Sequence, residues 1–204
     1  RAVCSPLRLF SDGAILSSFL RPQRTIGAVA TVTGFGYWSG QDVRVEFRPA
    51  PVNTGIVFVR CDLAPPHRIA AVVHHRIEVP RRSSLAAGGA TVEMVEHVMA
   101  ALHGLQIDNC EVWVDRPEMP GVDGSCLPFL TAFQSVGIVE QAALRAQLRV
   151  DRVIRVGDAQ AWCEARPATG NGYTITCAID YGVGHVIEYT GEGVQSLSVP
   201  ERAT

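Results

Sequence analysis

The chain has 204 residues, of which 47% are hydrophobic, so it can form a packed core and is not a disordered chain. Its formal net charge of −2 gives no indication that it binds nucleic acid or an anionic membrane surface. All 18 basic residues are arginine, which excludes a catalytic lysine within this sequence. No apolar run approaches the ~18 residues of a transmembrane segment. The six cysteines are scattered and form no CxxC pair, which favours reduced thiols and a cytoplasmic location.

Strands dominate the first predicted elements. Two are predicted at 26–33 and 42–47, on either side of a glycine-rich turn, GFGYWSG, at 34–40. Apolar and polar residues alternate along the second strand, which is typical of a strand buried on one face. Further along the chain we expect a strand at 56–60, a weaker one at 67–78 and a loop at 80–89.

A helix is predicted next, in the stretch TVEMVEHVMAALHGLQIDN at 91–109, with Thr91 as its N-cap and Gly104 at its end. Its apolar residues recur at helical spacing and predict packing against a sheet: Val92, Val95, Val98, Met99 and Leu102. The adjacent face carries Glu96 and His97, with Ala100 and Gly104 beside them. Because these neighbours are small, another backbone or a ligand can approach the two polar groups closely.

Glu96 and His97 are adjacent in sequence, so on a helix their side chains diverge by about 100° and cannot bind one metal symmetrically. They can lie side by side at a site in which His97 is a metal ligand and Glu96 transfers protons. On spacing alone, an ion pair or a polar helix edge explains the pair as well, because an isolated Glu-His dipeptide is a weak signal.

After this helix the sequence predicts a strand at 107–114, with Cys110, Val112 and Val114 on one face. A second helix is predicted at 127–136, ending near Gly137. The other elements expected in this half are a loop at 115–125 and a linker at 140–148.

The last part of the chain repeats the first. EFRPAPVN at 46–53 matches EARPATGN at 164–171, an offset of 118 residues. Strands are predicted at 149–156, 161–165 and 173–180, and the third ends in register with the first copy. The simplest explanation is a duplicated unit. At this offset the helices of the second unit would begin after Thr204, so we expect the second unit to be truncated.

Three segments in register resemble one family: VEHVMAALHGLQIDN at 95–109, PEMPGVDGS at 117–125 and RPAPVNTGIVFVRCDL at 48–63. They resemble the zinc-dependent UDP-3-O-acyl-N-acetylglucosamine deacetylases of lipid A biosynthesis, and the similarity extends from about Arg24 to about Ile187. The resemblance implies an α+β fold in which two units, each a sheet with two helices, form a β-α-α-β sandwich. It divides the chain into an unassigned segment at 1–22, a first domain at 23–146 and an incomplete second domain at 147–204.

The resemblance also implies a site. His97 matches the family's first zinc ligand, and Glu96 matches the general base that takes a proton from the attacking water. The other two zinc ligands, a His and an Asp one turn apart, fall beyond Thr204. We therefore expect this chain alone to be inactive, and a second-domain segment to complete the site in cis or in trans. The implied substrate is UDP-linked acylated N-acetylglucosamine.

One departure from the family pattern supports an alternative function. The family's glycine-rich turn carries a His where this sequence has Trp38, which can act neither as a metal ligand nor as a base. The alternative is a divergent, catalytically inactive homologue that binds a sugar nucleotide or a protein partner. Some members also carry cysteines near the metal where this chain has Arg82, Ser83 and Ser84. Arg82 can contact a substrate phosphate, although a solvated loop arginine is the more common case.

The remaining candidates have structural explanations. His74 and His75 are adjacent in a predicted strand and would point to opposite faces, which argues against a shared metal. His103, at the end of the predicted helix, suits the negative end of the helix dipole. His185 matches a family His but has an extra residue nearby, so we expect a structural role. An Asp-Gly turn explains Asp123–Ser125 as well as proximity to the site does.

Overall fold

The computed structural model describes residues 21–146, 150–167, 173–177 and 195–199. Strands and two helices make up this part of the chain, so the predicted α+β class is confirmed. The chain divides into two units after Ala146. The predicted duplication and the sandwich of two units stay predictions. Among the described residues, no helix is both long enough and apolar enough to span a membrane.

The first unit is built on a five-stranded sheet with the order β2-β3-β9-β4-β5. Neighbouring strands are antiparallel except β4 and β9, which run parallel because the intervening chain crosses over through a helix. In this register Val112 on the central strand lies between Phe47 and Phe58. The strands are β2 (Ala30–Phe35), β3 (Asp42–Pro49), β4 (Ile56–Arg60), β5 (His67–Ala70) and β9 (Cys110–Val114).

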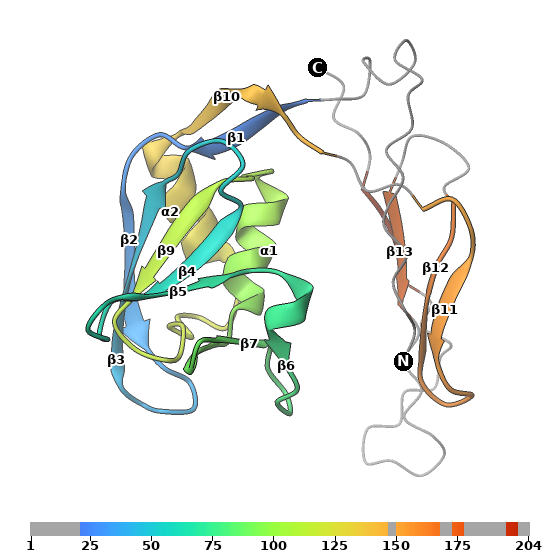
Figure 1. Ribbon diagram of the computed structural model, residues 1–204, viewed down its shortest axis with the longest axis horizontal. Coiled ribbons are helices and arrows are strands. Elements are labelled where there is room, and N and C mark those ends of the chain that lie inside the picture. The colour runs from blue at the N-terminus through green and yellow to red at the C-terminus, as the bar shows by residue number, and fades with distance from the viewer. Residues whose placement is uncertain (1–20, 147–149, 168–172, 178–194, 200–204) are drawn as a thin grey trace. The chain divides into compact units, whose positions relative to one another are not determined.

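Two helices, α1 (Glu96–Gly104) and α2 (Leu127–Val136), cover one face of this sheet (Figure 1). The ring of Phe47 on β3 meets the rings of Phe129 and Phe133 on α2, with centroids 6.0 and 4.7 Å apart. The predicted inward residues of two strands are all buried in this core: Val43, Val45, Phe47, Cys110, Val112 and Val114. The alternation read from the sequence therefore identified the correct face of both strands. The bounds predicted for α2 are also confirmed.

A small three-stranded sheet precedes α1; its first strand lies within the strand predicted at 67–78, and the other two lie where the sequence predicted a loop and the first turn of the helix. It consists of β6 (Arg76–Ile77), β7 (Ser84–Ala87) and β8 (Ala90–Glu93). Gly88 and Gly89, with φ of 54° and 84°, make the tight turn between β7 and β8. The prediction that Thr91 caps the helix is therefore wrong, because Thr91 pairs with Ala86 in the hairpin. Val92 is still buried, but as a strand residue.

A two-stranded ribbon, β1 (Pro22–Ile26) and β10 (Ile138–Leu144), closes the other end of the unit (Figure 1). This corrects two predictions. The strand expected at 26–33 is divided, because the Gly27 N–H leaves the sheet and donates to the Gly137 carbonyl at 2.9 Å. Residues 140–144 of the expected linker belong to β10. They pair with β1, which lies near the start of the described chain.

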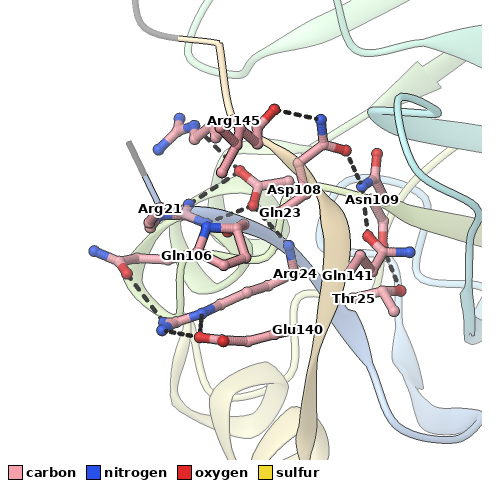
Figure 2. Close-up of polar contacts among 12 residues, drawn as sticks. Arg21, Gln23, Arg24, Thr25, Gln106, Asp108, Asn109, Glu140, Gln141 and Arg145 are labelled. Atoms are coloured by element: carbon pink, nitrogen blue, oxygen red, sulfur yellow. Dashed lines mark hydrogen bonds and ion pairs between the residues drawn. The ribbon is translucent and has the colours of Figure 1, made fainter. Parts of the chain in front are cut away.

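Side chains from the ribbon and from the 106–109 turn form a polar cluster, shown in Figure 2. Asn109 is buried, and its amide nitrogen donates to Gln23 Oε1 at 2.8 Å and to Gln141 Oε1 at 2.7 Å, while its oxygen accepts from the Gly55 N–H. Asp108 is held by Arg21 at 2.6 Å. Buried polar groups destabilise a fold unless they are hydrogen-bonded, so these contacts fix the ribbon to the sheet.

The described part of the second unit consists of two hairpins. β11 (Ile154–Gly157) pairs with β12 (Trp162–Ala165), and β13 (Tyr173–Cys177) pairs with β14 (Gln195–Val199). The predicted strands at 149–156, 161–165 and 173–180 correspond to the first three, whereas β14 was not predicted. His185 and the end of the sequence repeat lie outside the described residues.

Candidate active site

Glu96 is the first residue of α1, and the main chain of Ser83 holds it there. The Ser83 N–H donates to Glu96 Oε2 at 3.0 Å, and the Ser83 carbonyl accepts from the Val95 N–H at 3.3 Å. Met94, with φ of 59°, reverses the chain between β8 and the helix. The N-cap residue Val95 provides no side-chain hydrogen bond to the helix. The start of the helix is thus stabilised by the main chain of Ser83, just before β7, and not by a cap at Thr91.

His97 is the second residue of α1 and is half-buried. It lies near the loop that carries Asp123, whose carboxylate Oδ1 accepts from the Ser125 N–H at 2.9 Å and from Ser125 Oγ at 2.8 Å. These two hydrogen bonds lower the pKa of Asp123, and the charge of the His97 imidazole lowers it further. The predicted Asp-Gly turn is present, with Gly124 at φ of 79°. The predicted turn is therefore present, and the proximity of this loop to the site stays a prediction.

The glycine-rich turn is anchored by a buried carboxylate. Glu118 is 4% exposed, and its two oxygens accept from the Trp38 N–H at 2.7 Å and the Ser39 N–H at 2.9 Å. Burial alone would raise the pKa of Glu118, but the N–H donors outweigh it and the pKa is lowered. Gly36 is required here, because a Cβ at this position would lie 2.5 Å from Glu118 Oε2.

Trp38 projects from this turn and is 50% exposed. The guanidinium carbon of Arg82 lies 5.2 Å from the centroid of its ring, within the range of a cation–π contact. Arg82 Nε is also 2.9 Å from Glu93 Oε2. The expectation that Arg82 is a solvated loop residue is therefore wrong, because this side chain is only 22% exposed and its charge is matched by Glu93.

The other histidines differ from their predicted setting. His74 and His75 belong to a 3-10 helix, η2 (Val73–His75), and not to a strand. The Nδ1 atom of His75 lies 2.8 Å from the Ala70 carbonyl oxygen, a hydrogen bond that does not require a metal. His103 does lie in the last turn of α1, where the helix dipole favours a cation, but its role stays a prediction.

Two of the cysteines in the described part of the chain are poor candidates for a nucleophile. Four cysteines in the described part of the chain carry free thiols: Cys61, Cys110, Cys126 and Cys163. Burial raises the pKa of Cys110 to about 12, so its thiol stays protonated at neutral pH. Burial also raises the pKa of Cys61, which favours the unreactive thiol there as well.

The described residues do not form a metal site on their own. Within the ranges that the structure covers, no group of three or more His, Cys, Asp and Glu side chains is placed to hold a metal ion. A catalytic zinc site uses about three protein ligands and an open position. His97 can supply one of them, so any zinc bound at this helix would need ligands from elsewhere.

Comparison with known proteins defines the class of this fold and site. A family model described as UDP-3-O-acyl N-acetylglycosamine deacetylase matches residues 23–198. The chain therefore belongs to the UDP-3-O-acyl-N-acetylglucosamine deacetylase family.

Among its relatives is the UDP-3-O-acyl-N-acetylglucosamine deacetylase of Shewanella loihica, which is 44% identical over 160 residues, covering 78% of this chain and 52% of the relative. The enzyme of the same name from Shewanella piezotolerans is 42% identical over the same shares of the two chains. A bifunctional enzyme of Chlorobaculum tepidum is 38% identical over 78% of this chain and 34% of its own length. The chain thus spans about half the length of the first relatives.

Three contacts at this site were not predicted from the sequence. They are the Ser83 N–H on Glu96, the Glu118 carboxylate on the glycine-rich turn, and the stacking of Arg82 on Trp38. A glutamate between proline and methionine in the PEMPG segment gave only a weak signal for Glu118. The other two contacts join segments whose proximity no local pattern indicates.

Proposed function

We propose that the complete protein is a zinc-dependent amide hydrolase that removes acetate from UDP-3-O-acyl-N-acetylglucosamine in lipid A biosynthesis, in the cytoplasm. This chain would supply its first domain. Membership of the deacetylase family and the position of Glu96 and His97 together at the start of α1 support the proposal. The main observation is the fixed orientation of the Glu96 carboxylate by the Ser83 N–H.

Glu96 is proposed as the general base. Its Oε2 accepts the Ser83 N–H, whereas Oε1 has no hydrogen-bond partner among the residues that the structure describes. Oε1 is therefore the atom that would take a proton from the attacking water. General-base catalysis of this kind contributes about 10²- to 10⁴-fold to a rate.

His97 is proposed as one metal ligand, with the others coming from the second domain in cis or in trans. When bound, zinc would polarise the acetamide carbonyl as a Lewis acid. Asp123, close to His97, carries a negative charge that would favour a cation at this position. Within the described residues no group of three metal-binding side chains includes His97, and a division of ligands between domains accounts for this.

The alternative, an inactive homologue that binds a sugar nucleotide or a protein partner, is favoured by one observation. The resemblance places Trp38 where the family carries a His, and tryptophan can act neither as a metal ligand nor as a base. The genomic sequence after residue 204 discriminates between the two. An in-frame continuation with a His-xxx-Asp helix favours the hydrolase, and a stop codon favours the alternative.

The test is Glu96→Gln in the complete protein. We expect deacetylation to fall at least about 100-fold while zinc content stays the same. The matched control is Glu78→Gln, an exposed residue of the same unit, which should leave turnover unchanged. Unchanged turnover in Glu96→Gln would rule out this residue as the base.

The proposed sharing of the metal site is tested separately on the 204-residue chain. We expect sub-stoichiometric zinc and no hydrolysis, because one imidazole binds zinc weakly. Metal analysis that finds one tightly held zinc per chain would contradict the proposal that the ligands are divided between domains.

A further inference from the structure

Three segments that are distant in sequence meet beside Glu96. They are the glycine-rich turn with Trp38, the residues leading into β7 with Arg82 and Ser83, and the end of β8 with Glu93. Of the residues in these contacts, only Glu96 has a role in the proposed chemistry. The remaining contacts form a continuous series from the turn to the Glu96 carboxylate, and each of its steps is fixed in the structure.

The first step fixes the turn. Both Glu118 oxygens are used by the Trp38 and Ser39 main-chain N–H groups. The main chain beside Glu118 is itself bonded to β8, since the Glu93 N–H donates to the Pro117 carbonyl at 2.8 Å and the Met119 N–H donates to the Glu93 carbonyl at 3.0 Å. The base of the Trp38 side chain is therefore fixed relative to Glu93.

The second step holds Arg82 between Trp38 and Glu93. The guanidinium carbon of Arg82 lies 5.2 Å from the centroid of the Trp38 ring. Its Nε atom forms an ion pair with Glu93 Oε2 at 2.9 Å. A guanidinium is planar and always charged, so it can stack on a ring and pair with a carboxylate at the same time. The main chains of both partners are held, so these two contacts restrict the position of the Arg82 side chain. Its charge is matched by Glu93, which argues against the alternative that Arg82 contacts a substrate phosphate.

The third step connects Arg82 to the proposed base. Ser83 is the next residue, and its main chain makes two bonds to the start of α1, one to Glu96 Oε2 and one to the Val95 N–H. A residue whose side chain is fixed limits the main-chain movement of its neighbour. Because the two residues share a peptide bond, a restricted Arg82 would also restrict the direction of the Ser83 N–H.

We propose that Arg82 is a positioning residue for Glu96, with Trp38 and Glu93 as its two supports and the Ser83 N–H as the connection. The proposal rests on the proposed function, in which Glu96 is the base. In this proposal Trp38 serves to hold the Arg82 guanidinium. Tryptophan suits this role better than histidine, because indole gives the strongest cation–π contact.

The first measurement is made on the 204-residue chain and does not depend on activity. Hydrogen exchange of the Ser83 N–H is compared in the wild type, Arg82→Gln and Arg81→Gln. Arg81 is the matched control because it is adjacent, exposed and loses the same charge. We expect exchange about tenfold faster in Arg82→Gln, the usual scale for losing a cation–π contact and a partly buried ion pair, and within about twofold of wild type in Arg81→Gln. Equal exchange in the two variants would overturn the coupling.

The second measurement uses the complete protein, with rates normalised to the folded fraction. We expect Arg82→Gln to lower kcat about tenfold with KM within about twofold, and Arg82→Lys to restore part of the loss, because lysine keeps the charge but not the planar group. In a Glu96→Gln background, Arg82→Gln should not lower kcat any further. A purely structural effect would instead lower kcat by the same factor in both backgrounds. The same loss in both backgrounds would overturn the positioning role. A wild-type protein without deacetylase activity would instead refute the proposed function, and the exchange of the Ser83 N–H would still decide the coupling.

Discussion

Replacing Asp108 by asparagine should destabilise the first unit by about 2–3 kcal/mol, because its carboxylate connects the β1–β10 ribbon to the sheet (Figure 2). Oδ2 accepts from Arg21 Nη1 at 2.6 Å and from the Arg24 N–H at 2.9 Å. Oδ1 accepts from Arg21 Nη2 at 3.0 Å and lies 3.1 Å from Arg145 Nε. Every group that faces the carboxylate is a donor. Asparagine keeps the shape but has one oxygen, so its NH₂ group must face two of these donors.

The magnitude follows from the number of bonds lost and from exposure. A hydrogen bond to a charged group contributes about 1.5–3 kcal/mol, and two of the four are lost. The Asp108 side chain is 12% exposed, but the arginines are more exposed, so we discount the sum to about 2–3 kcal/mol for solvent screening. Glu140→Gln is the matched control, because Glu140 also pairs with an arginine of β1, at 2.9 Å, but is 57% exposed. Its loss should be below about 1 kcal/mol.

Hydrogen exchange of main-chain N–H groups on the central strands β3 and β9 measures the free energy of unfolding of this unit separately from the rest of the chain. At about 1.4 kcal/mol for each tenfold change, Asp108→Asn should exchange about 30- to 140-fold faster than wild type. Glu140→Gln should exchange less than about fivefold faster. If the two variants are equally affected, the ribbon is not held by this carboxylate and the reasoning fails.

Two further perturbations test the anchored turn and the core. At neutral pH, Glu118→Gln should lower the free energy of unfolding by about 1–3 kcal/mol, because it replaces a carboxylate that accepts two main-chain N–H groups. The pKa of Glu118 is below its ordinary value of 4.5 in the folded chain, so this contribution is complete above pH 4.5 and is lost as the pH falls through the folded-state pKa. A difference between wild type and variant that stays constant from pH 7 to about pH 3 would contradict this. Phe133→Ala should destabilise by about 3–5 kcal/mol, since the ring is fully buried against Phe47, whereas Leu127→Ala on the exposed side of the same helix should change stability by less than about 1 kcal/mol in urea titrations.

Elements whose pattern is local were predictable. The alternation in 42–47 and 110–114 identified the buried face of β3 and β9, because a one-residue error would place every apolar side chain in water. Helix α2 has Pro128 in its first turn and Gly137, with φ of 73°, just after its end. Both residues mark helix ends by their own backbone preferences, so the predicted bounds of this helix needed no information from the rest of the fold.

The start of α1 was not predictable in this way. Thr91 and Val92 suit a strand at least as well as a helix, and Val92 is apolar on the inward side in either case. Thr91 and Val92 form a strand because β8 pairs with β7 around the turn at Gly88 and Gly89. The β1–β10 ribbon depends even more on contacts between distant residues. Ile26 pairs with Ile138, and no local signal in 138–144 distinguishes a strand from a linker.

Part of the site was predictable from the sequence because its residues are neighbours in the chain. Glu96 and His97 are adjacent, so any helix places them together, and their family match needed no structure. Their supports come from other segments. Ser83 is 13 residues from Glu96, and Trp38 is 80 residues from Glu118. Contacts at these separations depend on the register of the hairpin and the order of the sheet, which sequence patterns do not specify.

The residue at position 38 separates the proposed hydrolase from its inactive alternative, and the contacts of Trp38 show what its presence changes. The contact of its main-chain N–H with Glu118 is available to any residue other than proline, so the turn itself does not depend on tryptophan. Only the ring contact with Arg82 is specific to an aromatic side chain. That contact leads through Ser83 to Glu96 and leaves His97 on its own helix untouched. If the family resemblance holds at position 38, Trp38 removes one imidazole but leaves the proposed base and the proposed first ligand in place, which is more consistent with an altered site than with a lost one.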